Sequence, residues 1–196
     1  MMPRQQGKPQ ALMPPHREGG MPLLAALMRR QSVREYSQRA LPLQVLSDLL
    51  WAACGVNRPS GDRTAPCWRH VPLIEIFVAK ADGVWIYDAK AHALRPWLAL
   101  DLRRLTGRQD FAATAALDLV YVARGEHLAG VNTDNRRLYA AADCGFIGQN
   151  VYLFCASEGL ATVFRHTLDF ASLEQALGLT GEQFVCFAQT VGYARD

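Results

Sequence analysis

The run Arg29-Arg30-Gln31-Ser32-Val33-Arg34 closes a short apolar helical pattern that begins after Pro22. It places three guanidinium groups and one hydroxyl within one helical turn and the residues that leave it. Guanidinium donors match phosphate oxygens in geometry, and one such charge-assisted hydrogen bond contributes about 1.5–3 kcal/mol. The arginine run, residues 29–34, therefore predicts a compact anion site. From spacing alone, a solvated basic helix C-terminus is an equally good interpretation, because cations also favour the helix dipole there.

The composition around this run is that of a globular protein. The chain has 196 residues, half of them hydrophobic and a fifth charged, which suits one domain with a full core. Its net charge is only +3, and basic residues outside the arginine run are mixed with acids, so a nucleic-acid partner is not expected. The five cysteines contain no Cys-x-x-Cys pair, which favours reduced thiols over a disulfide framework. Since no stretch has the ~20 apolar residues of a membrane span, we expect a cytoplasmic protein with no membrane partner.

The chain divides near residue 20. Residues 1–20 contain prolines, glycines and polar residues without an apolar period, which predicts a flexible N-terminal arm. Residues 21–196 form the predicted domain. Helices are expected over residues 22–28, 43–54, 134–158 and 171–177, and strands over residues 73–79, 84–87, 117–123, 162–164 and 184–193. Because helices and strands do not alternate strictly, the fold class is α+β rather than a doubly wound sheet.

Two further features of this domain invite a functional interpretation. The irregular segment 56–71 is long for a loop inside a compact domain, and such loops are usually functional or disordered. The long helix carries small residues at Ala141, Ala142, Gly145 and Gly148, where another helix or a ring system could approach closely. Simple core packing explains the same small residues equally well.

The order and wording of these motifs resemble the nitroreductase family of FMN-dependent oxidoreductases, in particular a short subgroup of it. The matching stretches are residues 20–23, 29–36, 42–55, 63–66, 139–162 and 189–193. The resemblance covers nearly everything after Gly19. It implies a central, mostly antiparallel sheet flanked by helices, in an intertwined homodimer that holds flavin at the subunit interface, with the long helix at the centre of that contact. Aromatic residues that could belong to this interface are Trp51, Trp68, Tyr152 and Phe154.

The resemblance also assigns cofactor-binding residues. In the family, the first cluster binds the phosphate and ribityl chain of FMN, the loop after the second helix contacts the flavin ring, and the stretch after the long helix lines the other side of the ring. Carried over, the cofactor-binding residues are Arg30, Gln31, Ser32, Arg34, Pro66, Cys67, His70, Thr162, Val163 and Arg165. Arg29 is assigned a supporting role. No catalytic side chain is expected, because the flavin performs the chemistry.

The ring-contacting loop departs from the family pattern. The usual Pro-Ser-(Ser/Ala)-x-Asn-x-Gln reads Pro66-Cys67-Trp68-Arg69-His70-Val71-Pro72 here. An imidazole at the Asn position lacks the simultaneous donor and acceptor of an amide, and a proline at the Gln position has no N–H. Cys67 and His70 could also form a metal pair or a nucleophilic dyad, but neither a further ligand nor an orienting partner is evident, so no metal is expected.

The resemblance implies an FMN-dependent oxidoreductase that takes electrons from NAD(P)H. Its small-molecule acceptors would be nitroaromatics, quinones or similar electron-poor compounds, reduced by ping-pong hydride transfer through flavin N5. Two alternatives stay open. One is a flavin-dependent dehydrogenase or oxidase of a peptide or small metabolite. The other is a non-catalytic homodimer in which Trp68, His70 and Pro72 have removed flavin chemistry from the retained fold.

Overall fold

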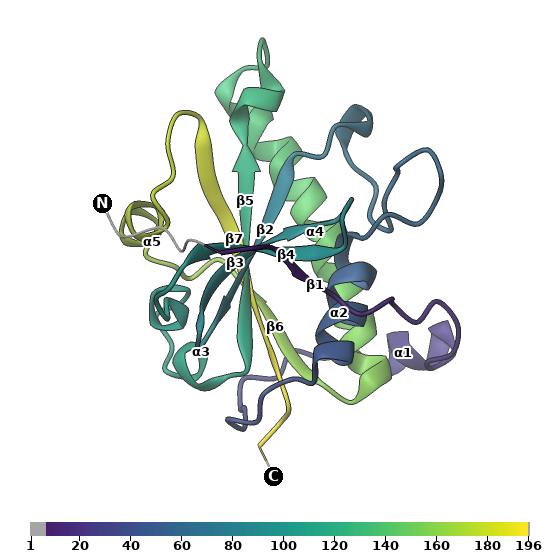
Figure 1. Cartoon of the computed structure of the whole chain (residues 1–196). Coiled ribbons are helices and arrows are strands. Elements are labelled where there is room, and N and C mark those ends of the chain that lie inside the picture. Colours follow the sequence, from purple (N-terminus) through teal and green to yellow (C-terminus); the bar gives the residue numbers. More distant parts are fainter. Residues whose placement is uncertain (1–6, 196) are drawn as a thin grey trace.

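A seven-stranded antiparallel sheet forms the centre of the computed structural model, which describes residues 7–195 (Figure 1). The strand order is β1-β4-β3-β2-β5-β7-β6. The strands are β1 (Gln10–Ala11), β2 (Ile74–Lys80), β3 (Gly83–Asp88), β4 (Ala93–Leu98), β5 (Leu117–Arg124), β6 (Ala161–Arg165) and β7 (Gln183–Gly192). The predicted α+β class and mostly antiparallel sheet are confirmed.

Helices cover both faces of this sheet. They are α1 (Leu23–Arg29), α2 (Leu43–Cys54), α3 (Phe111–Thr114), α4 (Thr133–Glu158) and α5 (Phe170–Leu177), with shorter 3₁₀ turns at Trp68–His70, Arg103–Leu105 and Gly125–Leu128. Ile76 and Val78 of β2 pack with α2 and α4 on one face, whereas Phe77 and Ala79 pack with α5 on the other. Successive strand residues point to opposite faces, so the consecutive apolar residues 76–79 of β2 serve both layers.

The long helix α4 runs across the sheet and has a defined beginning and end. At its start, the Asn132 side chain accepts a hydrogen bond from the Asn135 N–H, which satisfies one free donor of the first turn. At its end, Gly159 adopts a left-handed conformation with φ 68°, which glycine tolerates without a Cβ clash. The predicted helix over residues 134–158 is confirmed within one residue. No helix in the described part of the chain is long and apolar enough to cross a membrane.

Strands β1 and β4 were not expected from the sequence. β4 contains Arg95 and Pro96, which interrupt any apolar alternation, and β1 pairs only two residues with it, Gln10 with Leu94 and Ala11 with Ala93. Pairing of backbone groups needs no side-chain pattern, so these strands leave little trace in the sequence.

The predicted flexible arm is attached to the body over its described part, since residues 7–20 lie against β4 and α2. The Ser47 hydroxyl donates to the Met13 carbonyl, and His16 contacts the Asp48 carboxylate through its N–H and its ring. Residues 7–20 are therefore packed on the domain, while residues 1–6 of the predicted arm lie outside the described residues.

Candidate functional site

The arginine run leaves α1 and is fixed on the edge strand β6. Arg30 ends the helix because its ψ of 122° is extended, while its N–H still donates to the Ala26 carbonyl at 2.9 Å. Three residues later, the Val33 N–H donates to the Thr162 carbonyl of β6 at 3.0 Å. The backbone thus places the side chains of Gln31 and Ser32 between the end of α1 and the start of β6.

Tyr152 of α4 connects these elements through one hydroxyl. This hydroxyl accepts a hydrogen bond from the Phe164 N–H at 2.9 Å and lies 2.7 Å from the Ser32 hydroxyl. The Arg30 guanidinium lies over the Tyr152 ring, 5.2 Å from its centroid. One tyrosine therefore holds the arginine run, α4 and β6 in a fixed relation.

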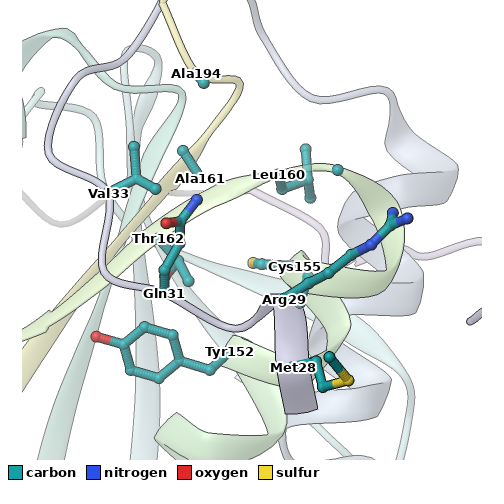
Figure 2. Close-up of a pocket in the computed structure, with 12 residues that line it drawn as sticks. Met28, Arg29, Gln31, Val33, Tyr152, Cys155, Leu160, Ala161, Thr162 and Ala194 are labelled. Carbon is teal, nitrogen blue, oxygen red and sulfur yellow. The ribbon is translucent and has the colours of Figure 1, made fainter. Parts of the chain in front are cut away.

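A cavity of about 470 Å³ opens beside this junction (Figure 2). Arg29 and Gln31 contribute polar groups, and Cys155 and Leu160 contribute apolar surface. The lining residues are Met28, Arg29, Gln31, Val33, Tyr152, Cys155, Ala156, Gly159, Leu160, Ala161, Thr162 and Ala194. Figure 2 shows that they come from the arginine run, the end of α4, β6 and the C-terminal segment. A concave site of this volume suits a small-molecule ligand.

The arginines of the run are available to a ligand. Across residues 7–195, no carboxylate forms an ion pair with Arg29, Arg30 or Arg34. Arg34 and Ser32 are exposed, and Arg30 is half-buried against Tyr152. Three guanidinium groups without a carboxylate partner favour an anion, as the arginine run predicts. Arg29, assigned only a supporting role from the sequence, lines the cavity directly.

Thr162 and Val163 are neighbours on β6, but their side chains lie on opposite faces of the sheet. Thr162 lines the cavity, and its hydroxyl accepts a hydrogen bond from the Gln189 amide at 3.2 Å. The Val163 side chain points to the opposite face of the sheet, where it packs with Tyr36 and Ala115 in a buried cluster. The alternation of strand side chains thus makes Val163 a core residue rather than a cavity residue.

Arg165, a predicted cofactor-binding residue, is committed to an internal ion pair. Its guanidinium donates to Asp118 Oδ1 at 2.7 Å and to the Thr106 carbonyl at 2.6 Å, and its side chain is only 3% exposed. Arg165 therefore has a structural role within the chain, and its predicted contact with the cofactor stays a prediction. Burial raises the pKa of Asp118 to about 6, and the neighbouring Arg165 charge opposes this rise.

The loop that carries Pro66, Cys67 and His70 lies against the N-terminal half of α4, whereas the cavity lies at the C-terminal end of this helix. Trp68 stacks on Tyr139 with ring centroids 4.9 Å apart. The backbone N–H of Trp68 donates a hydrogen bond to the Asp143 carboxylate at 3.4 Å. Pro66 and Cys67 face a small hollow beside Asp143. The His70 side chain is 87% exposed and its ring nitrogen lies 3.3 Å from Asp62. The described residues contain no cluster of three metal-ligating side chains.

The structure thus does not bring all predicted site residues together within one chain. Gln31 and Thr162 line the cavity, Arg30 and Ser32 adjoin it through their contacts with Tyr152, and Arg34 follows on the same exposed segment. Tyr139, beside the loop, and Tyr152, beside the cavity, are thirteen residues apart on α4, or about 20 Å at 1.5 Å per residue. The sequence indicates Tyr152 only as a candidate interface aromatic, because the contacts of its hydroxyl depend on two segments distant in sequence.

Comparisons with known proteins agree with this architecture. The chain matches the model described as "Nitroreductase family" over residues 27–193. A curated protein of Methanocaldococcus jannaschii, named as a candidate nitroreductase, is 34% identical over 147 residues, which are 70% of this chain and 74% of that protein.

Solved structures show the same likeness. The crystal structure of a candidate nitroreductase from Ralstonia eutropha JMP134 is 38% identical and superposes with a TM-score of 0.90 over 100% of both chains. The NADPH:FMN oxidoreductase of Vibrio harveyi, solved with NAD+, is 19% identical with a TM-score of 0.66 over 89% of this chain and 69% of that one, which shows a shared fold.

Proposed function

Because this chain belongs to the nitroreductase family, we propose that it is an FMN-dependent oxidoreductase that reduces nitroaromatics, quinones or similar electron-poor acceptors with electrons from NAD(P)H. Membership of the family makes it an oxidoreductase of the flavoprotein type. FMN, when bound, supplies two-electron chemistry by accepting a hydride at N5 from the nicotinamide and passing it to the acceptor.

The observation that carries the proposal is the set of donors close to Tyr152 that form no ion pair with a described carboxylate. The phosphate of FMN is a dianion, and Arg30, Arg34 and the Ser32 hydroxyl are donors of the kind it needs. Ser32 is held by the Tyr152 hydroxyl, so this donor is positioned before a ligand arrives. The residues present therefore fit the phosphate and ribityl end of the cofactor.

The remaining predicted contacts support a site that two copies of the chain complete. The loop with Pro66, Cys67 and His70 lies about 20 Å along α4 from the cavity, and we infer that it contacts a flavin held by the partner rather than by its own chain. In this arrangement the chain provides no proton donor or nucleophile of its own. Its residues bind the phosphate, orient the ring and exclude water from it.

The proposal is tested first by the spectrum of the purified protein. We expect flavin absorbance, or FMN uptake on titration at micromolar concentration, and NADH or NADPH oxidation when a quinone is added. Protein that takes up no FMN would contradict the proposal. FMN uptake without nicotinamide oxidation would indicate a flavin-binding dimer that lacks this activity.

The site itself is tested by the variant Arg34→Ala. One charge-assisted phosphate contact is worth about 1.5–3 kcal/mol, so FMN affinity is expected to fall about ten- to a hundredfold. Arg104→Ala, which removes an exposed arginine far from the run in sequence, is the matched control and should keep the affinity. An unchanged affinity in Arg34→Ala would remove Arg34 from the site.

A further inference from the structure

The N-terminal arm meets the domain at the turn between β3 and β4. β1 adds Gln10 and Ala11 to the edge of β4, and the next residue, Leu12, donates its backbone N–H to the His92 carbonyl at 3.1 Å. The Leu12 side chain is buried in the core cluster that includes apolar residues of α2. From β1 the arm runs past α2 toward α1 (Figure 1). His92 therefore lies where the arm leaves the sheet.

The His92 ring joins the arm to α2 and β3. Its Nε2 lies 2.7 Å from the Ser47 hydroxyl and 3.1 Å from the Met13 carbonyl, and its Nδ1 lies 3.0 Å from the Tyr87 hydroxyl. The Ser47 hydroxyl donates its single proton to the Met13 carbonyl, so it can only accept from Nε2. Nε2 therefore carries the hydrogen. In a neutral imidazole Nδ1 is then an acceptor, and it takes the Tyr87 O–H.

A second proton on the ring conflicts with this arrangement. It would sit on Nδ1, to which the Tyr87 hydroxyl donates, so that two hydrogens would face each other. Tyr87 is buried, and its hydroxyl makes no other hydrogen bond among the described residues. Burial lowers the pKa of His92, and the Arg17 guanidinium adds to this lowering. The hydrogen bond to the Met13 carbonyl and the nearby Asp48 carboxylate oppose it. The attached arm thus favours the neutral ring.

We propose that neutral His92 holds the N-terminal arm on the domain, and that protonation of its ring in acid releases residues 10–14. The ring of the detached arm takes up a proton near pH 6.5, the ordinary pKa of histidine. Attachment is therefore complete above about pH 6.5 and weakens as the pH falls below it, by at most about tenfold per pH unit for one proton. The weakening ends once the ring is protonated in the attached arm as well.

Release of the arm would also open a cavity. This cavity, of about 310 Å³, lies between the arm and the helices α2 and α4, and its lining includes Trp51 and Phe154. The Arg17 guanidinium of the arm lies over the Trp51 ring, 6.0 Å from its centroid. When the arm leaves, these two aromatic side chains lose one wall of the cavity and meet solvent.

The proposal is tested by hydrogen–deuterium exchange of the full chain at about pH 5 and pH 8, with rates corrected for the intrinsic effect of pH. We expect protection of the backbone amides of residues 10–13 to fall severalfold at the lower pH, up to the limit of about thirtyfold set by one proton. The amides of β5 should keep their protection. His92→Gln retains an N–H donor for Ser47 but cannot take up a proton, so its arm should be equally protected at both pH values.

His16→Gln is the matched control, because it removes the other imidazole of the arm. The His16 ring lies 2.9 Å from the Asp48 carboxylate, and a proton on it would strengthen that contact rather than break it. The pH response should therefore persist in this variant and be no smaller than in the natural protein.

Three results would overturn the proposal: equal protection at the two pH values, a full pH response in His92→Gln, or a response that disappears in His16→Gln. If the arm of His92→Gln is unprotected at both pH values, the imidazole ¹⁵N spectrum of the natural protein decides. A neutral Nε2–H ring for His92 that titrates below about pH 6.5 supports the proposal, and an Nδ1–H ring or a higher midpoint contradicts it.

Discussion

At the scale of single residues, Tyr152 and Arg165 show that the groups a side chain bonds to determine its function. Tyr152 carries a hydroxyl that joins Ser32 and the Phe164 N–H, and so it sets the shape of the candidate phosphate site. Arg165 has the chemistry of a phosphate ligand, but Asp118 already occupies its guanidinium. From residue type alone, Arg165 rather than Tyr152 would be expected to contribute to the phosphate site.

We expect Tyr152→Phe to weaken FMN binding about three- to tenfold and to lower the free energy of unfolding by about 1 kcal/mol. The reason is that Ser32 loses its fixed position and the Phe164 N–H loses its acceptor. Tyr139→Phe is the matched control, since Tyr139 lies on the same helix and its hydroxyl bonds to no described residue. FMN titration and urea unfolding measure the two effects. Equal behaviour of the two variants would contradict the assigned role of Tyr152.

The variant Arg165→Met is expected to lower the free energy of unfolding by about 3–5 kcal/mol, because it leaves the Asp118 carboxylate buried without its partner. The double variant Asp118→Asn with Arg165→Met should recover part of this loss, since no buried charge then remains. Urea unfolding of both proteins provides the comparison. A small stability loss together with a large loss of FMN affinity would instead return Arg165 to the cofactor site.

At the scale of elements, α4 organises three separate features along its length. Its first half holds the loop with Cys67 and His70 through Tyr139 and Asp143, and its second half holds the arginine run through Tyr152. Gly148 lets the helix approach β6, because a Cβ there would lie 2.6 Å from the Phe164 ring. The small residue at position 148 therefore serves packing within the chain.

The attachment of the loop to α4 should depend on pH through Asp143. Burial raises the pKa of Asp143 to about 6, whereas the unfolded chain has a value near 3.9. Between about pH 4 and 6 the folded protein keeps a proton that the unfolded chain has lost, so the free energy of unfolding falls as pH rises.

We expect Asp143→Asn to remove this dependence while keeping an oxygen for the Trp68 N–H. The variant should gain on the order of 1–2 kcal/mol over the natural protein between pH 4 and pH 7, measured by urea unfolding across that range. Asp110→Asn, an exposed carboxylate, is the control. Parallel stability curves for Asp143→Asn and the natural protein would show that Asp143 does not titrate in this range.

At the scale of the whole molecule, the described chain exposes apolar side chains on α4 and α1, and we propose that a second copy of the chain covers them. Phe146 and Leu138 on α4 are 49% and 61% exposed, and α1 adds a further group beside the cavity. The exposed apolar residues of α1 are Leu23, Leu24, Leu27 and Met28. Apolar surface of this extent on neighbouring helices is typical of an obligate interface.

For the proposed homodimer, we expect Phe146→Glu to separate the two copies and to weaken FMN binding, because the partner's loop would then be lost from the proposed site. Burying a new carboxylate in an apolar interface is strongly unfavourable. Sedimentation velocity measures the oligomeric state, and FMN titration measures the affinity. Leu100→Glu, at a residue 45% exposed after β4, is the control and should stay dimeric. A Phe146→Glu protein that stays dimeric with unchanged affinity would place the interface elsewhere.

The sequence predicts those elements whose side chains repeat a pattern. Helix α4 with its glycine end, and the apolar strands β2, β5 and β7, follow from periodicity and agree closely with the structure. Strands β1 and β4 do not, because backbone pairing holds them without a regular side-chain pattern. The same limit affects the site. Residues 29–32 lie together because they are neighbours in the chain, whereas Tyr152 joins them only through packing.

The sequence by itself determined the α+β class, the long central helix and an arginine run at the end of a helix where an anion can bind. Only the tertiary structure decided which arginines are free for that anion. In the sheet register, Asp118 of β5 lies opposite Thr190 of β7, and Thr190 lies opposite Val163 of β6. Arg165 follows Val163 by two residues on the same face of β6, and this register brings its guanidinium to Asp118. That meeting depends on the register of three strands far apart in the chain. Local patterns fix what a segment becomes, and register fixes which charges neutralise each other.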